Sequence, residues 1–463
     1  MIAIIAEKPS VGMDIARVVG ADTRNDGYCS GNGYMVTWAL GHLVSLAMPD
    51  TYGYTKTAAE DLPMLPDPFR LVSRQVRTDR GMVTDIAASK QLKVIESVFN
   101  RCDSIIVATD AGREGELIFR WIYAFLDCKK PFRRLWISSL TDEAIRKGLE
   151  ELKDGSEYDS LYAAADSRAK ADWLVGMNAS RALAIVSGTP NSSIGRVQTP
   201  TLAMICARFK ENRGFVSTPY WQLHVTLQGK CTHRRFFHVG NFNDKAEAEA
   251  AYRHIPSGSV AEITKAERKE TVQEAPLLYD LTTLQKEANT KHGFSAEQTL
   301  SIAQKLYEAK LITYPRTGSR HISEDVFAEI PTLLLTLKNN PAWGGYISGM
   351  GDLSRRSVDD TKITDHHALL VTEVKAQHLG AEERIIYDMI AGRMLEAFGE
   401  RCVKDVTTVS AECGDVAFSI KGSVIKQAGW RGVYRQSEET EEVTLPEWKE
   451  GDTLPVKGCS LTE

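Results

Sequence analysis

Short apolar runs, each followed by a polar turn and an amphipathic helix, organise the start of the chain. Residues 2–6 form an apolar run that ends in a charged turn with a proline, and residues 11–19 have the pattern of a helix. The same order returns as a strand at 105–110 and an amphipathic helix at 112–126. This repetition predicts a parallel α/β domain, in which functional side chains gather where strands end and helices begin.

The rest of the chain alternates between helical and β-type patterns. Residues 141–212 have a helical pattern that is interrupted by a loop at 188–200. Segments with β-type alternation follow at 216–271 and return at 403–434, and a helical insert of roughly 277–402 lies between them. A β region cut by a helical insert predicts one domain that emerges from another and returns to it.

The clearest helix of the insert begins near Ser295, which together with Gln298 is typical of a capping box. The buried stripe of this helix is expected at Leu300, Ala303, Leu306 and Tyr307. A short apolar segment follows the helix, and Pro315 breaks any regular structure there. Tyr314 is therefore expected at an abrupt exit, beside Arg316.

Composition sets limits on the class of protein. With 463 residues, 43% hydrophobic and 25% charged, the chain fits a soluble globular protein of about three domains. It has no run near the roughly 18 apolar residues of a membrane span, and it lacks the basic start of a signal peptide. Its eight cysteines form no C-x-x-C pair, which favours reduced thiols in the cytoplasm. The net charge of −5 means that any DNA contact must be local, and the acidic stretch 436–452 is expected to be a solvated loop.

Carboxylates occur at the predicted ends of the first strands. Glu7 with Lys8 follows one strand, and Asp110 with Glu114 follows the other. Such oxygen ligands suit a hard cation such as Mg²⁺. Acidic side chains are also common at helix starts, where the helix dipole favours them, so both interpretations stay open.

Other candidate residues also allow two interpretations. Tyr314 is either a core side chain or a nucleophile, with Arg316 stabilising a phosphoryl oxyanion. His366 and His367 point to opposite faces if the segment is extended, so at most one serves a given site. The loop 193–198 offers a glycine and Arg and Gln donors for a phosphate contact, or merely links two helices. The chain contains neither a P-loop motif nor a G-x-G-x-x-G motif.

Taken together, these segments resemble type IA DNA topoisomerases, and most closely the topoisomerase III branch. The matching motifs occur in the family's order and span nearly the whole chain. They are AEKPS (6–10), GHL (41–43), ATDAGREGE (108–116), SSLT (138–141), SSIGRVQTPTL (192–202), LYDLTTLQKEAN (278–289), LITYPRT (311–317) and DHHA (365–368). Each motif alone is weak, but the ordered set is specific.

The resemblance implies a multidomain fold that combines α/β, helical and β parts in a ring with a hole for DNA. The expected parts are a Toprim α/β domain at 1–155, a helical DNA-binding domain at 156–215, a β arch at 216–276 that returns at 403–463, and a helical domain with the active-site tyrosine at 277–402. The family usually continues beyond the point where this chain stops, so a C-terminally truncated chain is expected.

The resemblance also implies a mechanism. Tyr314 would attack one phosphodiester of single-stranded DNA, leaving a 5′-phosphotyrosyl link and a free 3′-hydroxyl. Another strand would pass through the gap before the hydroxyl reseals it, without ATP. Arg316, Lys8 and His366 would act at the scissile phosphate. Glu7 would exchange a proton with the leaving oxygen.

Cofactor and partners follow from the same resemblance. Mg²⁺ is the implied cofactor, with Glu7, Asp110 and Glu114 as its ligands. The implied DNA-contacting residues are His42, Arg168, Asp172, Ser193, Ile194, Gly195, Arg196, Val197 and Gln198. We expect a cytoplasmic monomer that binds single-stranded DNA, or DNA with single-stranded regions, and no membrane.

Two positions depart from the family pattern. Gly112 stands where the acidic motif D-x-D-x-E commonly has its second Asp, and Gly318 follows Thr317 where an Asp is frequent. The missing carboxylate predicts weaker Mg²⁺ binding. These departures keep open a rival, a catalytically weak or inactive single-stranded DNA-binding protein. A primase-like Toprim enzyme would explain the acidic cluster but not LITYPRT.

Overall fold

The structure is a computed structural model that describes residues 1–78, 81–137, 140–189, 192–229, 233–256, 258–363, 366–434 and 443–463. The chain divides into two compact units. The first unit consists of residues 1–214, 316–329 and 359–368, and the second of residues 215–315, 330–358 and 369–463. One boundary between the units therefore falls between Pro315 and Arg316.

A seven-stranded sheet forms the centre of the first unit, in the order β11-β10-β9-β1-β4-β3-β2. Its strands are β1 (Ile2–Ala6), β2 (Thr23–Asn25), β3 (Tyr28–Gly31), β4 (Tyr34–Trp38), β9 (Ser104–Ala108), β10 (Phe132–Arg134) and β11 (Lys153–Asp154). The four central strands β10, β9, β1 and β4 are parallel, and the outer strands are antiparallel. The α/β fold with parallel strands that the sequence predicts is confirmed.

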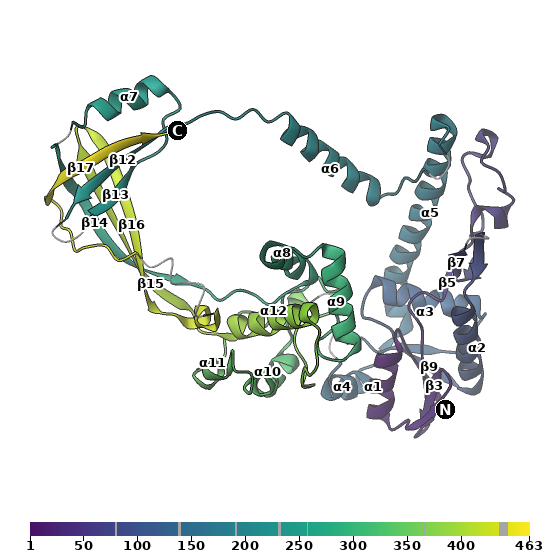
Figure 1. Ribbon diagram of the computed structural model, residues 1–463. Coiled ribbons are helices and arrows are strands. Elements are labelled where there is room, and N and C mark those ends of the chain that lie inside the picture. The colour runs from purple at the N-terminus through teal and green to yellow at the C-terminus, as the bar shows by residue number, and fades with distance from the viewer. Residues whose placement is uncertain are drawn as a thin grey trace. The chain divides into compact units, whose positions relative to one another are not determined.

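Helices cover both faces of this sheet, because its central strands are apolar on both sides (Figure 1). The helices are α1 (Pro9–Val19), α2 (Ile86–Arg101), α3 (Arg113–Phe125) and α4 (Asp142–Glu150). Along β1, Ile5 belongs to the core that includes α2 and α3, and its neighbour Ile4 belongs to the core that includes α1 and α4. This alternation follows from the two-residue period of a strand.

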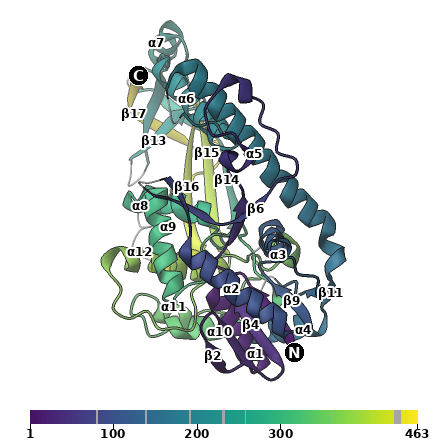
Figure 2. The ribbon, with the colours of Figure 1, turned by 90° about the vertical axis from the view of Figure 1, so that its right-hand side faces the viewer.

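Two long helices complete the first unit, α5 (Asp159–Ser187) and α6 (Gln198–Arg213). Figure 2 shows the length of α5, which packs against α3. Trp173 of α5 is buried, and its indole Nε1 donates a hydrogen bond of 2.9 Å to the carbonyl of Ala47. The rings of Tyr52 and Phe69 pack edge-on against it, so the segment that contains them is fastened to the helix.

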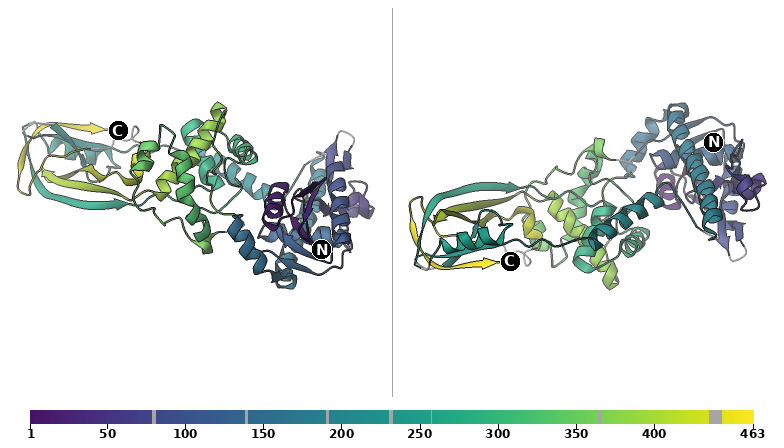
Figure 3. Two further views of the ribbon diagram at one scale, coloured as in Figure 1. Left: turned by 90° about the horizontal axis from the view of Figure 1, so that it is seen from below. Right: turned by 90° about the horizontal axis from the view of Figure 1, so that it is seen from above.

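Six antiparallel strands close into a barrel in the second unit, in the order β12-β13-β16-β15-β14-β17 (Figures 1 and 3). The strands are β12 (Gln222–Gln228), β13 (His233–His238), β14 (Val260–Gln273), β15 (Cys402–Cys413), β16 (Val416–Gln427) and β17 (Thr453–Thr462). Leu223, Val225 and Leu227 alternate along β12 and are fully buried in the barrel core. Closure leaves no free sheet edge.

One element inside the predicted β region is a helix instead. The sequence predicts β-type segments throughout 216–271, but residues Lys245–Arg253 form helix α7. The Asp244 side chain caps this helix by accepting the N–H groups of Ala246 and Glu247. The alanine-rich sequence that follows the cap favours a helix, and Ala248 is buried in it.

The remaining helices lie between the two β segments of the chain. They are α8 (Leu281–His292), α9 (Ala296–Glu308), α10 (Glu324–Leu337), α11 (Gly344–Ser348) and α12 (Ala381–Phe398). Ser295 caps α9 as expected, since its Oγ accepts the N–H of Gln298 at 3.0 Å. The second contact of the capping box, from the Gln298 side chain back to the start of the helix, is not formed. Instead, the Gln298 amide donates to Glu382 Oε1 at 2.9 Å. Of the expected stripe, Ala303 and Leu306 are buried, whereas Leu300 and Tyr307 are half-buried.

Two further expectations concern solvent and membrane. Residues 436–442 of the predicted acidic loop lie outside the described residues, and residues 443–452 are exposed or half-buried. Within the described ranges, none of the helices combines the length and apolar character of a membrane span. The division of the chain at residues 155, 215, 276 and 402 stays a prediction.

Two adjacent phenylalanines of β13 test the barrel core. Phe236 is fully buried, whereas Phe237 is 45% exposed. We expect Phe236→Ala to destabilise the barrel by about 3–5 kcal/mol, because it leaves a cavity in a packed core. Phe237→Ala should cost only about 0.5 kcal/mol. Hydrogen exchange of the β12 and β16 amides measures both changes, and equal acceleration in the two variants would contradict this core.

Candidate active site and DNA interface

Two predicted carboxylates meet at one edge of the seven-stranded sheet. The parallel register pairs Ala6 of β1 with Ala108 of β9, so the turns after these strands are neighbours. The backbone N–H of Asp110 donates a hydrogen bond of 3.2 Å to Glu7 Oε2. The structure therefore brings Glu7 and Asp110 together where parallel strands end, the usual place for functional groups in such sheets.

Two nitrogen groups contact Asp110 at this edge. Lys8 Nζ lies 2.9 Å from Asp110 Oδ2 and 3.8 Å from Glu7 Oε1. His366 Nε2 lies 3.1 Å from the same Oδ2 atom. All four side chains belong to the first unit and are at most about one fifth exposed. A cluster of two carboxylates, an ammonium group and an imidazole is thus assembled from segments far apart in the sequence.

The two neighbouring histidines serve different environments. His366 contacts Asp110, whereas Nδ1 of His367 lies 2.7 Å from the carbonyl oxygen of Ala368. Burial lowers the pKa of His367. The backbone of His366 is fixed by Thr317, whose hydroxyl donates to the His366 carbonyl at 2.9 Å. Only one of the two histidines reaches the cluster, as expected for successive residues of an extended segment.

The two carboxyl groups have opposite pKa shifts. Burial and the charge of Asp110 raise the pKa of Glu7 to about 7, although Lys8 opposes this shift. Burial also acts to raise the pKa of Asp110, but hydrogen bonds and charges from His366 and Lys8 hold it below its usual range. A carboxyl group with a pKa near neutrality can act both as a proton donor and as a proton acceptor.

The turn that carries Asp110 is held by an arginine that no sequence motif marks. Arg134 on β10 is 1% exposed, and its Nη2 donates to the carbonyl of Asp110 at 2.7 Å. Its Nη1 donates to the carbonyls of Val107 and Leu135, both at 2.9 Å. Its Nε donates to Glu116 Oε2 at 3.1 Å. The sequence gives little signal for this role, because β10 reads Phe-Arg-Arg and arginine is usually a surface residue.

Two glycines next to this turn, Gly112 and Gly115, differ in whether a side chain could replace the hydrogen atom. A Cβ atom on Gly115 would lie 2.1 Å from the carbonyl oxygen of Asp110, so a glycine lets α3 approach the turn closely. Thr109 strengthens the approach, because its hydroxyl donates to the Gly115 carbonyl at 2.7 Å. Gly112 caps α3 with φ −164° and ψ 176°, an extended conformation open to any residue. The backbone therefore requires glycine at 115 but not at 112.

The third predicted metal ligand points elsewhere. Glu114 is held by Arg168, whose Nη1 donates to Oε1 at 2.9 Å, and by His42, whose Nε2 lies 3.4 Å from Oε2. Within the described ranges, no group of three or more His, Cys, Asp or Glu side chains is placed to hold a metal ion. Glu114 is thus paired with Arg168 and His42, and the ligand set of Glu7, Asp110 and Glu114 expected from the sequence stays a prediction.

Four of the residues predicted to contact DNA are linked with Glu114 in a continuous chain of contacts between charged and polar groups. It starts at His42 and Glu114 and passes through Arg168, whose Nε lies 3.9 Å from Asp172 Oδ2. Arg196 completes the chain, with its Nε donating to Asp172 Oδ1 at 2.6 Å. Four of these side chains are between 40% and 45% exposed, and Glu114 is 51% exposed. The structure therefore brings distant predicted residues together on one accessible surface.

The loop before α6 extends this surface. The N–H of Ile194 donates to Ser180 Oγ of α5 at 2.9 Å, and the N–H of Gly195 donates to Thr199 Oγ1 at 3.1 Å. Gln198 Nε2 donates to Ser193 Oγ at 2.8 Å, which closes the loop on itself. The exposed members of the loop are Ser193, Arg196, Val197 and Gln198.

The predicted nucleophile ends a short segment of the second unit. The N–H of Thr313 donates to the carbonyl of Leu370 at 2.9 Å, and the Thr313 hydroxyl accepts the N–H of Leu370 at 3.0 Å. The ring of Tyr314 is half-buried and packs edge-on against Tyr307 of α9, with 5.3 Å between ring centroids. Arg316 lies across the unit boundary in the sequence and is exposed.

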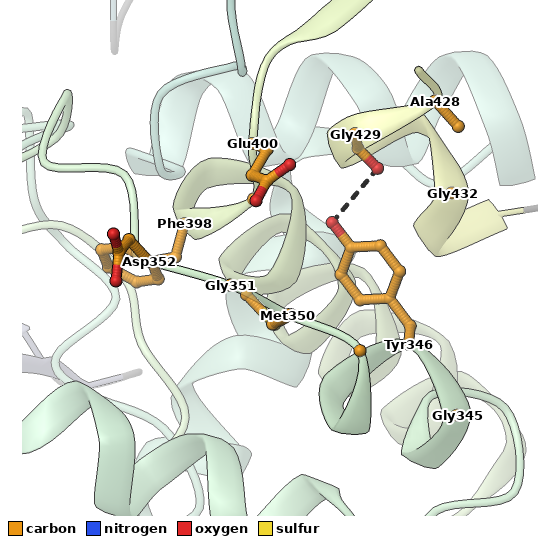
Figure 4. Close-up of a pocket in the computed structure, with 12 residues that line it drawn as sticks. Gly345, Tyr346, Met350, Gly351, Asp352, Phe398, Glu400, Ala428, Gly429 and Gly432 are labelled. Atoms are coloured by element: carbon orange, nitrogen blue, oxygen red, sulfur yellow. Dashed lines mark hydrogen bonds between the residues drawn. The ribbon is translucent and has the colours of Figure 1, made fainter. Parts of the chain in front are cut away.

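Of the two cavities described next, one is lined by predicted site residues and the other is not. A small cavity of about 30 Å³ in the first unit borders Asp110 and His366 and has room for about one water molecule. A cavity of about 260 Å³ in the second unit is lined by glycines and by Tyr346, Asp352 and Glu400 (Figure 4). The Tyr346 hydroxyl points to the carbonyl of Gly429 at 3.3 Å. No residue predicted from the sequence as functional lines this second cavity.

Comparisons with known proteins agree across the whole chain. A family model described as DNA topoisomerase matches residues 156–463, and a model described as Toprim domain matches residues 2–140. DNA topoisomerase 3 of Bacillus subtilis (strain 168) is 40% identical over 482 residues, covering 99% of this chain and 64% of the relative. DNA topoisomerase 3 of Bacillus thuringiensis (strain Al Hakam) is 41% identical over 480 residues, with coverages of 98% and 63%. The chain thus spans just under two thirds of the length of these relatives.

A solved structure has a similar fold. It is the full-length topoisomerase I from Thermotoga maritima, with a TM-score of 0.67 and 20% sequence identity, covering 99% of this chain and 71% of that chain. At this identity the comparison concerns the fold alone. Toprim domains generally bind a metal ion, usually Mg²⁺.

The close approach at Gly115 can be tested by substitution. We expect Gly115→Ala to cost about 1–3 kcal/mol of stability, because the added methyl group overlaps the Asp110 carbonyl. Gly318→Ala is the matched control, since nothing lies within 4 Å of its Cβ position. Thermal unfolding should show a lower Tm only for Gly115→Ala. An unchanged Tm in that variant would contradict the packing of α3 on the turn.

Proposed function

The chain belongs to the type IA DNA topoisomerase family, and from this premise we propose that it cleaves and reseals one DNA strand through Tyr314 without ATP, relaxing or decatenating DNA. The observation that carries the proposal is the cluster of Glu7, Lys8, Asp110 and His366 at the edge of the sheet. It combines a proton-exchanging carboxyl group with positive charge, the combination that phosphodiester cleavage requires.

The chemistry is an exchange of phosphodiester bonds. The Tyr314 hydroxyl gives up its proton to water and its oxygen attacks the phosphorus atom, forming a bond from the tyrosine oxygen to phosphorus as the bond to the 3′-oxygen breaks. Glu7 suits the proton transfer, because a carboxyl group with a pKa of about 7 is partly protonated at neutral pH and can protonate the leaving oxygen. Resealing is the reverse, with Glu7 accepting the proton from the 3′-hydroxyl.

Positive side chains offset the charge of the phosphate. Lys8 is bound to Asp110, and it can turn to a phosphate oxygen at little cost because its ammonium is compact and its stem is flexible. Arg316 is exposed and adjoins the tyrosine in the sequence. His366 keeps its contact with Asp110 during this change, so one partner remains for that carboxylate.

Single-stranded DNA is the proposed substrate of the accessible ion-pair surface. Arg168 and Arg196 are held by Glu114 and Asp172, so phosphate groups must compete with these carboxylates for the two guanidinium groups. Arginine suits this role, because its planar fork binds either partner with two hydrogen bonds. The relatives come from bacteria, in which DNA lies in the cytoplasm, and we place the reaction there.

Mg²⁺ is the proposed metal, and the residues present fit it in part. Glu7 and Asp110 supply the hard oxygen ligands that Mg²⁺ prefers, and their proximity favours a cation between them. The Lys8 ammonium lies close to both carboxylates, so a metal ion and Lys8 compete for this place. When bound, Mg²⁺ would supply positive charge that stabilises the phosphate undergoing exchange.

The rival interpretation, an inactive single-stranded DNA-binding protein, is separated from the enzyme by the covalent intermediate. Tyr314→Phe should abolish the adduct with labelled single-stranded DNA and leave binding within about twofold, because it removes one hydroxyl and keeps the ring. Tyr307→Phe is the matched control, since it removes the hydroxyl of the neighbouring tyrosine and keeps the ring that packs on Tyr314. Denaturing electrophoresis measures the adduct. A wild-type protein that binds DNA but forms no adduct would support the rival.

The departure at Gly112 gives a test of the metal site. Gly112→Asp adds a third carboxylate next to Asp110, and the extended backbone at this position tolerates a side chain. We expect half-maximal relaxation at a lower Mg²⁺ concentration, together with a larger rise of Tm on adding Mg²⁺. A stable Gly112→Asp protein with neither change would show that position 112 lies outside the cation site. Gly458→Asp, which adds the same charge at an exposed glycine with nothing within 4 Å of its Cβ position, controls for net charge.

A further inference from the structure

A two-stranded hairpin in the first unit has exposed side chains on both of its faces. It consists of β7 (Gln75–Thr78) and β8 (Gly81–Thr84), and its register places Val76 opposite Val83 and Arg77 opposite Met82. The three apolar side chains are 41–46% exposed. An isolated ribbon of this kind is only marginally stable in water, and exposed apolar side chains in a group are typical of a binding surface.

The hairpin is fastened at its root to the segment that carries His42. Arg74, which precedes β7, donates from Nε and Nη2 to Asp85 Oδ2 at 2.9 and 2.5 Å. Its Nη1 donates to the carbonyls of Leu40 and His42, both at 3.1 Å. The N–H of Arg74 donates to the carbonyl of Leu43 at 2.7 Å. The ribbon therefore starts beside a residue of the proposed DNA surface, and its root is held by several hydrogen bonds.

The charge of this region differs from that of the whole chain. Residues 70–101 contain seven arginine or lysine residues against three acidic ones, in a chain with a net charge of −5. Arg77 on the hairpin and Lys93 on α2 are both exposed. A local excess of positive charge next to a proposed DNA surface is complementary to phosphate groups.

The composition of the ribbon favours duplex DNA over a single strand. Single strands are usually bound by aromatic side chains that stack on bases, and residues 75–84 contain no aromatic residue. A two-stranded ribbon fits the major groove of B-DNA, where arginine contacts guanine or phosphate and apolar groups contact the thymine methyl. Arg77, Met82 and the Val76–Val83 pair are side chains of these kinds.

We propose that the β7–β8 hairpin binds duplex DNA that flanks the single-stranded segment at the His42 surface. This inference rests on the proposed function, because it assumes that a single strand lies along that surface. It adds a binding element for a junction between single-stranded and duplex DNA, and it takes no part in the bond exchange.

The test compares two DNA probes in proteins that also carry Tyr314→Phe, so that only binding is measured. One probe is a short single strand, and the other is the same strand extended by a duplex. The test variant is Arg77→Glu with Met82→Ser. Lys129→Glu is the matched control, because it brings the same change of charge to an exposed residue outside 70–101. Thermal unfolding confirms that each variant is folded.

We expect the duplex extension to tighten binding about tenfold, the worth of a well-placed arginine contact. The test variant should lose this gain and bind the single strand within about twofold of the parent. Its salt slope on the extended probe should fall by about 0.9 for each phosphate that the protein no longer neutralises. The Lys129→Glu control should keep the gain.

Two results would overturn the inference. If the duplex extension brings no gain in the parent protein, the hairpin serves another partner, such as a protein strand that adds to the edge of β8. If the test variant loses affinity equally for both probes, the hairpin belongs to the single-strand surface. Failure of the proposed function is seen separately, as an absence of covalent adduct in proteins that retain Tyr314, and it leaves the duplex gain measurable.

Discussion

The buried guanidinium group of Arg134 is the contact on which the geometry of the candidate site depends. It joins the end of β9 to α3, because it binds the Asp110 carbonyl and the Glu116 carboxylate at the same time. Glu116 is itself only 1% exposed and also binds Arg120. Removing one partner from such a buried pair costs about 3–5 kcal/mol, because the other charge is left without compensation. The stability of the first unit and the position of Asp110 are therefore coupled through one side chain.

With the turn in place, charge determines the chemistry of the sheet edge. Glu7 and Asp110 are too close to be ionised independently, and the contacts of Asp110 with Lys8 and His366 lower its pKa, whereas the pKa of Glu7 is raised. Asp110 stays charged and holds Lys8 and His366. Glu7 has a pKa of about 7, so it can exchange protons at neutral pH. The division of two similar groups into an anchor and an acid–base group follows from their surroundings, as in other active sites with paired carboxyl groups.

Contacts between charged side chains also organise the proposed DNA surface, although these side chains are more exposed than those of the sheet edge. His42, Glu114, Arg168, Asp172 and Arg196 hold one another in position before any nucleic acid is present. Such exposed pairs contribute little to stability, so their exchange for phosphate contacts is inexpensive. The arginines are already ordered in the free protein, so less conformational entropy is lost when DNA binds and the affinity is higher.

Local patterns in the sequence were enough to predict several elements. The apolar runs at 2–6 and 105–110 predicted the central strands, because a strand buried on both faces needs apolar side chains at every position. The order of the motifs identified the family, and Ser295 marked the start of α9. By contrast, α7 was missed, because its Asp cap and alanines lie within a stretch whose flanking segments alternate as strands do.

Only the tertiary structure decided which charged groups meet. The sequence placed Glu7, Asp110 and Glu114 at strand ends, but the fold joins the first two and turns Glu114 to Arg168. Arg134 carried no distinctive local signal, since its partners lie on other elements. Sequence periodicity records whether a side chain faces the core or the solvent, because burial acts on each residue separately. The partner of a charge depends on packing between distant segments, and that information appears only when the chain is folded.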